Sequence, residues 1–195
     1  MKYRAITGEN FYFTEMKNTG KFLLESQSIE NIREVFKEKD ILDCTSKNNF
    51  NKKFQTINKR FKILTTILIY QLVNSDINSA KFIVLYSILC NERIIAEFMD
   101  EIVKEKYDNY DYYLKDGDFI KFINHKVEQS EIVEKWSDST KKKIILKLKN
   151  FLLESGFIKK EKEKLYKILK PLIIPEVINE IKENGNKSIL KIMLY

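Results

Sequence analysis

The stretch SKNNFNKKFQTINKRFKIL, residues 46–64, carries the strongest periodic signal in the chain. Its apolar residues recur at steps of four, three, four and three, the spacing of one face of an α-helix. Ser46 stands directly before the pattern, where a hydroxyl can cap the first turn. We therefore predict a helix that begins after Ser46 and turns one apolar face inward. That face consists of Phe50, Phe54, Ile57, Phe61 and Leu64.

The remaining faces of this helix are basic and rich in asparagine. Residues 46–75 hold six Lys or Arg residues and no Asp or Glu, whereas an ordinary solvated helix usually mixes both signs. Cations neutralise phosphates, and Asn or Gln amides pair with adenine edges. The pattern favours contact with nucleic acid, and a merely solvated face is the alternative. The candidate residues are Ser46, Lys47, Asn49, Lys52, Lys53, Lys59 and Arg60.

Two helices are expected before this one. The first begins near Phe13 and extends to Glu25, and Ser28 is placed to cap a short second helix that ends around Lys39. A short second helix followed by a basic third helix is typical of a helix-turn-helix unit, which presents its third helix to DNA. We predict such a unit over residues 1–75.

A second three-helix pattern occupies residues 116–195. One helix follows residues 116–118, and Ser130 caps a short helix that ends at Lys135. The third helix runs from about Ser139 to Glu154. Gly156 follows it, at the place where a left-handed residue commonly ends a helix.

The segments after this third helix suggest a wing. Residues 157–160 and 164–169 can form two short strands of a basic hairpin. Pro175 then opens a final helix over residues 176–183. Together with the three helices, this order predicts a winged-helix-like unit.

The third helix of the second unit is also basic. Ser139 and Thr140 can cap it or bind a phosphate through free amide donors, and both readings stay open. Trp136 can stack a base or close the helix start as an apolar staple. The candidate nucleic-acid residues of this unit are Ser139, Thr140, Lys141, Lys142, Lys143, Lys147, Lys159 and Lys160.

Residues 76–115 differ in kind from their neighbours. Ile77–Tyr107 is apolar around most of the helical circumference, so it predicts one or two buried helices. Tyrosines interleaved with aspartates then indicate an acidic loop up to Asp116. The expected fold is all-α, with two helix-turn-helix-like units around a helical core, the second unit with a short β-hairpin.

The charge of the chain is unevenly placed. The chain has 35 basic and 28 acidic side chains, a net charge of +7. Residues 76–134 hold seven basic and thirteen acidic side chains, whereas residues 141–170 hold eleven and three. Two basic blocks therefore flank an acidic middle, and each attracts polyanions locally.

The sequence offers little for catalysis. His125 is the only histidine, and Cys44 and Cys90 match no metal spacing. Glu97 and Glu101 lie at helical spacing with other acids and could hold a divalent ion, but a solvated helix face is the simpler interpretation. No glycine-rich phosphate loop or nucleophile elbow is present. We predict no catalytic residue, no metal and no cofactor.

The same features favour a protein of the cytoplasm. Residues 1–10 are polar and lack the apolar segment of a signal peptide. The most apolar stretch, Ile63–Val73, has eleven residues, too few to cross a bilayer. Two distant cysteines suggest a reducing compartment. We expect no membrane association.

Five motifs occur in order along nearly the whole chain, namely YRAITG at 3–8, SIENIR at 28–33, NKRF at 58–61, WSDST at 136–140 and LLESGF at 152–157. Their order and spacing together resemble the BrxA family of BREX phage-defence systems. The chain departs from the family where members often have Arg-Leu and this sequence has Arg60-Phe61. The resemblance implies a small helical DNA-binding accessory protein without enzymatic activity, encoded beside a methyltransferase and a phosphatase-like factor, with a likeness to the antitermination protein NusB.

Three functions remain open at this point. The first is binding of double-stranded DNA, chiefly through phosphates, within a defence complex that contains other BREX proteins. The second is a protein-interaction scaffold whose basic faces dock an acidic partner. The third is RNA binding of the NusB kind.

Overall fold

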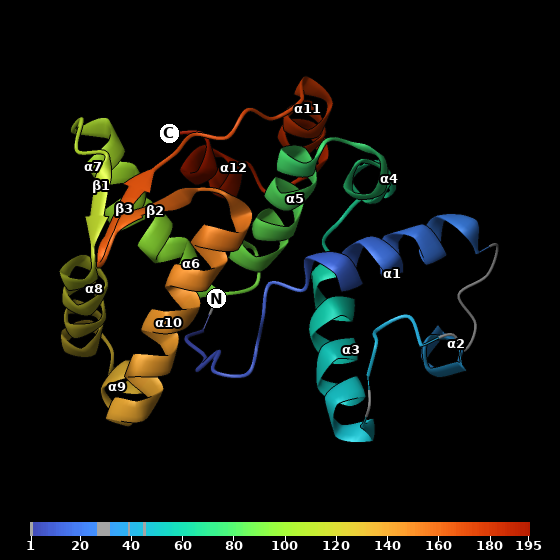
Figure 1. The fold of residues 1–195 in the computed structure, drawn as a ribbon, viewed down its shortest axis with the longest axis horizontal. Helices are drawn as coiled ribbons and strands as arrows, with labels where there is room; N and C mark the ends of the chain where they lie inside the picture. The colour runs from blue at the N-terminus through green and yellow to red at the C-terminus, as the bar shows by residue number, and fades with distance from the viewer. Residues whose placement is uncertain (1, 27–31, 39, 45) are drawn as a thin grey trace.

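The centre of the molecule is the helix α5 (Ile77–Leu89), which is apolar on every side. The computed structural model describes residues 2–26, 32–38, 40–44 and 46–195. A helix that is apolar all round has to be covered by other elements of the fold, and Figure 1 shows helices on both sides of α5. The Asp76 carboxylate caps α5 by accepting hydrogen bonds from the backbone N–H groups of Asn78 and Ser79. The buried residues of α5 include Ala80, Phe82, Ile83, Val84 and Leu85.

Four helices from the N-terminal part of the chain lie on one side of α5 (Figure 1). The predicted helix from Phe13 to Glu25 and the predicted helix after Ser46 are both confirmed. The cap predicted at Ser28 lies outside the described residues. The four helices are α1 (Phe13–Glu25), α2 (Ile32–Glu38), α3 (Lys47–Phe61) and α4 (Thr66–Asn74).

Close packing ties these helices together. A Cβ atom at Gly20 of α1 would lie 2.9 Å from Cγ2 of Val73, so the close approach of α1 to the end of α4 requires glycine. The ring of Phe36 on α2 meets Phe22 and Phe54 edge to face, at centroid distances of 5.4 and 5.6 Å. These contacts hold α2 between α1 and α3.

The other side of α5 begins with one helical run that passes through a π-helical turn. The prediction of one or two buried helices over Ile77–Tyr107 is thereby confirmed, as α5 and this run. Its parts are α6 (Arg93–Phe98), η1 (Met99–Lys104) and α7 (Glu105–Asp108). Three further helices follow the run, namely α8 (Asp116–Gln129), α9 (Glu131–Glu134) and α10 (Asp138–Ser155). Phe119 and Phe122 pack α8 against Phe98 of the run, and α10 packs against α5 and α8.

A small antiparallel sheet accompanies these helices. Its strands are β1 (Tyr113–Lys115), β2 (Ile158–Lys162) and β3 (Leu165–Ile168), in the order β1-β3-β2. The β2–β3 hairpin confirms the predicted pair of strands. The acidic loop expected before residue 116 was wrong in part, because Tyr113 pairs with Lys167 and Leu114 is completely buried.

Two helices close the chain, α11 (Pro175–Asn184) and α12 (Lys187–Met193). The first confirms the helix predicted after Pro175, whereas the second was not predicted. Both pack near α5, and the buried hydroxyl of Tyr86 accepts a hydrogen bond of 2.6 Å from the backbone N–H of Asn186. The backbone N–H of Ile174 likewise donates to Ser79 Oγ, 3.1 Å away.

The fold is mainly helical, with one small sheet. A single cluster of buried apolar residues extends from Ile6 to Met193 and includes side chains of the segments 1–75, 76–115 and 116–195. Within the described part of the chain, no helix is both long and apolar enough to cross a membrane.

Candidate nucleic-acid interface

The helix α10 begins with a hydroxyl cap. Ser137 Oγ accepts a hydrogen bond of 3.2 Å from the backbone N–H of Thr140, and Ser137 lies just outside the helix. The helix therefore starts before Ser139, and neither Ser139 nor Thr140 is the N-cap residue. Their hydroxyls lie 3.0 Å from Ser137 Oγ and extend the polar start of the helix.

One face of α10 is buried and the opposite face is exposed. Ile144, Leu148 and Phe151 point into the core. Lys142 and Lys143 are exposed near the start of the helix. Leu146 lies about one turn further on, near the middle of the helix, and is 55% exposed. The outward face is thus cationic at its start and apolar at its middle.

Three consecutive lysines, Lys141, Lys142 and Lys143, are free of ion pairs with the described residues. Between α8 and α10, Lys141 and Lys142 line a cavity of about 370 Å³ together with Asn124. Lys149 reaches the same cavity, but its ammonium group is held 2.7 Å from Asp116. Asp138 also lines this cavity but forms no ion pair with these lysines, so an anion that approached this side of α10 would meet a surplus of positive charge.

Lys147 has a different environment from these three. Its ammonium group donates a hydrogen bond of 2.5 Å to Asn10 Oδ1, in the segment that precedes α1. Burial lowers the pKa of Lys147. The Lys147 side chain joins α10 to the N-terminal segment, so Lys147 does not belong to the proposed interface.

The hairpin that follows α10 adds two exposed lysines. Lys159 and Lys160 on β2 are exposed, and neither forms an ion pair with any residue that the structure describes. Glu161 and Glu163 are also exposed at the tip of the hairpin. We use the name α10–hairpin surface for Ser139, Thr140, Lys141, Lys142, Lys143, Lys159 and Lys160.

The start of α3 has the predicted geometry. Ser46 Oγ accepts a hydrogen bond of 3.3 Å from the backbone N–H of Asn49, which confirms the cap. Lys47, Asn49 and Lys52 are exposed, and Lys52 borders a shallow cavity beside Arg4. This end of α3 is therefore accessible to a phosphate.

The rest of the basic sequence of α3 is used inside the protein. Lys53 lies 2.9 Å from the Glu15 carboxylate and donates to the carbonyl of Leu42. Lys59 lies 2.5 Å from Glu92, whose side chain is 3% exposed. Both ammonium groups hold other segments in place, so neither belongs to the accessible surface.

Arg60 is the clearest departure from the predicted site. Its side chain is 2% exposed and donates to the carbonyl oxygens of Phe11 and Asn10, at 2.6 and 2.7 Å. Burial lowers the pKa of Arg60 to about 10, so the guanidinium stays charged at neutral pH. Since no phosphate can reach it, Arg60 is a structural residue that anchors the N-terminal segment.

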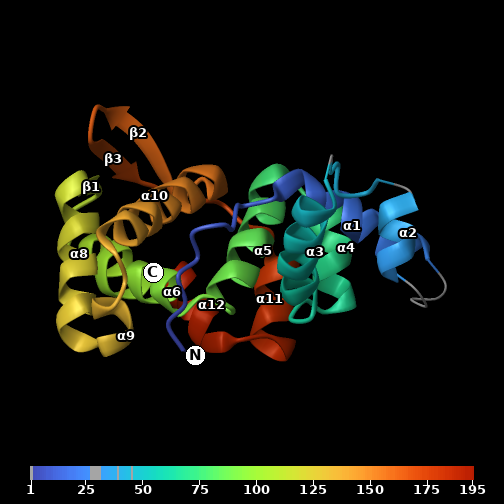
Figure 2. The same ribbon diagram turned by 90° about the horizontal axis from the view of Figure 1, so that it is seen from below.

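That segment is a feature that the sequence analysis missed. It runs between α3 and α10 in both ribbon views (Figures 1 and 2). Tyr3 donates a hydrogen bond of 2.6 Å to Glu97, and Arg4 pairs with the buried Glu92. No periodic pattern marks these residues, and the YRAITG motif at 3–8 gives no indication of their partners. The acidic surplus of α6 and η1, which needs cations from elsewhere, is the signal that could have found these contacts.

The same network explains the row of carboxylates in the middle of the chain. Lys126, which is 3% exposed, lies 3.0 Å from Glu97 and 2.5 Å from Glu101. Glu97 and Glu101 are only partly exposed and neutralise this buried lysine. Among the described residues, no group of three or more His, Cys, Asp or Glu side chains is placed to hold a metal ion.

Comparisons with known proteins match the whole length of this structure. A model of the BrxA family matches residues 1–185. A BREX protein BrxA from Bacillus cereus (strain H3081.97) is 31% identical over 190 residues, which cover 97% of this chain and 94% of that protein. The crystal structure of an uncharacterized protein from Magnetospirillum magneticum has a TM-score of 0.80 at 17% identity and covers 100% of this chain and 99% of its own, which shows a shared fold.

Proposed function

The chain belongs to the BrxA family, and from this premise we propose that it acts in BREX phage defence as a non-catalytic, cytoplasmic protein that binds double-stranded DNA. The α10–hairpin surface is the main contact, and the exposed start of α3 is a second one. The single observation that carries the proposal is the run of three lysines at the start of α10 that the protein leaves without internal partners.

The arrangement around α10 supports this choice. The order β1, α8, α9, α10, β2, β3, with β3 in the centre of the sheet, supports a winged-helix-like unit. In such units the recognition helix enters the major groove with its N-terminal residues against the base edges. Here that end carries Ser139 and Thr140, which can donate to phosphates, followed directly by Lys141.

The exposed Leu146 also fits a DNA contact. An apolar side chain in the middle of a recognition helix can lie against the methyl group of thymine. Most of the affinity is expected from lysine and phosphate pairs, however, and such binding weakens as salt is added because counterions are released when the pairs form. The proposal thus predicts modest sequence preference and strong salt dependence.

The use of the polar groups supports a non-catalytic role. The buried carboxylate of Glu92 and the partly buried carboxylate of Glu97 are both neutralised by cations of the protein. His125 is exposed and contacts Gln129. We infer that these groups serve the fold, and that other BREX proteins, as partners, supply the chemistry.

The test is fluorescence anisotropy of a labelled duplex with the full chain at several salt concentrations. Changing Lys141, Lys142 and Lys143 to alanine should weaken binding at least about tenfold near 0.1 M salt and lower the slope of log K against log salt by roughly 3. The matched control changes Lys182, Lys187 and Lys191, three exposed lysines of α11 and α12, to alanine. This control variant changes the net charge by the same amount and should leave the slope of log K against log salt nearly unchanged.

Other outcomes would favour other functions. Equal loss of affinity in the two triple variants would mean that net charge, not the α10–hairpin surface, governs binding. A structured RNA that displaces the duplex at equal concentration would favour RNA binding. Absence of any duplex binding at low salt, with co-purification of an acidic partner protein, would favour the scaffold.

A further inference from the structure

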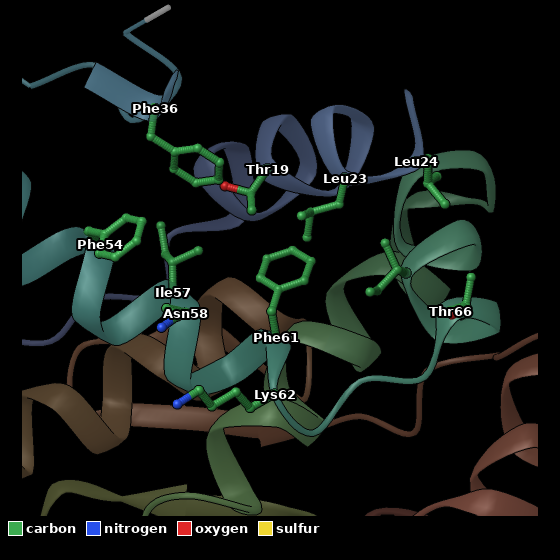
Figure 3. A pocket seen from close by; sticks show the side chains of 11 residues that line it. Thr19, Leu23, Leu24, Phe36, Phe54, Ile57, Asn58, Phe61, Lys62 and Thr66 are labelled. Carbon is green, nitrogen blue, oxygen red and sulfur yellow. The ribbon is translucent and has the colours of Figure 1, made fainter. Parts of the chain in front are cut away.

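A pocket of about 310 Å³ lies away from the α10–hairpin surface, among α1, α2, α3 and α4 (Figure 3). Pockets of this size are in the range that holds small organic ligands. All four helices contribute side chains to its wall, and the wall is mostly apolar. The apolar lining includes Leu23, Leu24, Phe54, Ile57, Phe61 and Ile69.

One buried polar atom faces this apolar wall. The side chain of Thr19 is 2% exposed, and its Oγ1 atom has no hydrogen-bond partner among the described residues. In Figure 3 the Thr19 oxygen points from α1 toward Phe36, into the space that the lining residues enclose. A threonine within a helix can satisfy its hydroxyl on the carbonyl four residues earlier. Thr19 does not, and leaving a buried hydroxyl unpaired is unfavourable.

The rim of the pocket has the opposite character. Asn58 of α3 and Lys62, which directly follows α3, are both exposed and line it. Lys62 forms no ion pair with the residues described, and residues 46–75 contain no carboxylate that could neutralise it. The rim therefore offers a cation and an amide to a negatively charged group.

We propose that this pocket binds a small amphiphilic acid with a hydrogen-bonding oxygen at its far end. The apolar body of the ligand fills the space between α1 and α3. Its inner oxygen pairs with Thr19 Oγ1, and its carboxylate lies at the rim against Lys62 and Asn58. A medium-chain hydroxy fatty acid has this chemistry. The site is separate from the α10–hairpin surface and makes the N-terminal helices a receptor for a metabolite.

Isothermal titration calorimetry of the full chain with three probes tests the proposal. The probes are 8-hydroxyoctanoic acid, which has both polar ends, octanoic acid, which lacks the inner oxygen, and octan-1-ol, which lacks the charge. The hydroxy acid should bind most tightly. Thr19→Val should weaken it about fivefold, to the affinity of octanoic acid, and leave octanoic acid unchanged.

The charge at the rim is tested separately. Lys62→Ala should weaken both acids about fivefold and leave octan-1-ol unchanged, since hydrogen bonds to charged groups contribute more than neutral ones. Lys21→Ala, at an exposed position of α1, is the matched control and should change none of the three affinities.

Saturable binding with this pattern of losses supports the site. Absence of saturable binding by all three probes overturns it, as does equal weakening of octanoic acid and the hydroxy acid by Thr19→Val. Circular dichroism verifies that each variant is folded.

Methyl resonances of Ile57 and Ile69 provide a second readout in the wild-type chain. Both resonances should shift on titration with the hydroxy acid, because both side chains line the pocket. Unshifted resonances at saturation would contradict the proposal.

Discussion

Glu97 joins three separate parts of the chain at one carboxylate. Burial opposes its ionisation, but hydrogen bonds from Tyr3, Arg93 and Lys126 outweigh that effect and lower the pKa below the ordinary value of 4.5. A carboxylate with a lowered pKa stabilises the fold at pH values above its unfolded pKa. That contribution is lost as the pH falls through the lowered pKa of the folded state.

The expected consequence is an acid-sensitive free energy of unfolding. Between about pH 5 and pH 3 the wild type should lose stability more steeply than Glu97→Gln, which is less stable at pH 7 but has no proton to gain at this position. Urea denaturation at several pH values measures both slopes. The exposed Glu183→Gln is the control, and a Glu97→Gln slope equal to that of the wild type would refute the role of Glu97.

Arg60 differs from its basic neighbours because it is wholly enclosed. Arg60→Met removes the donors to the carbonyls of Asn10 and Phe11, so the variant should lose about 3 kcal/mol of unfolding free energy. Lys52→Met, at an exposed position of the same helix, should change stability by less than about 0.5 kcal/mol. If urea denaturation showed equal effects, Arg60 would not be the anchor of the N-terminal segment.

Sequence reasoning located the basic helices correctly but not the use of each cation. Periodicity correctly identifies Phe50 and Ile57 as inward residues, because both are apolar and both lie on the apolar face of the helix. It gives no warning that Arg60 is buried, since its acceptors are backbone carbonyls about fifty positions away. Which lysines remain free is decided by tertiary partners such as Glu15 and Glu92, and these cannot be inferred from local sequence.

At the scale of elements, the local sequence was sufficient to predict the start or end of a helix where the helix carries its own capping residue. Ser46 starts α3 as predicted, and Gly156 ends α10. Elements that depend on distant partners were missed. The strand β1 has three residues and forms against β3, fifty positions later, whereas α12 has seven residues and is short for a helix that lacks tertiary support.

Gly156 gives an element-scale prediction. Its φ of +82° is a conformation that residues with a Cβ rarely adopt, although nothing lies within 4 Å of the place where a Cβ would be. Gly156→Ala should therefore destabilise the protein by about 1 kcal/mol through backbone strain alone. Gly117→Ala, at a position that is also open, is the control, and thermal unfolding compares the two. A larger loss at position 117 would contradict the role of Gly156 as the end of α10.

At the scale of the whole molecule, α5 connects the two halves. Its buried side chains belong to the same apolar cluster as those of the N-terminal helices and of α10. We therefore expect one cooperative unfolding transition, although the sequence pattern suggests two helix-turn-helix-like units and a core. Calorimetric and van't Hoff enthalpies should agree. Two resolved transitions would instead show that the segments 1–75 and 116–195 unfold as separate units.

The central claim is that DNA lies against the α10–hairpin surface. Acetylation of lysines with and without a saturating DNA duplex, read residue by residue by mass spectrometry, tests it most directly. We expect the duplex to protect Lys141, Lys142, Lys143, Lys159 and Lys160 severalfold, while Lys182, Lys187 and Lys191 react equally in both samples. Equal reactivity of the first group with and without bound duplex, or protection confined to the second group, would contradict it.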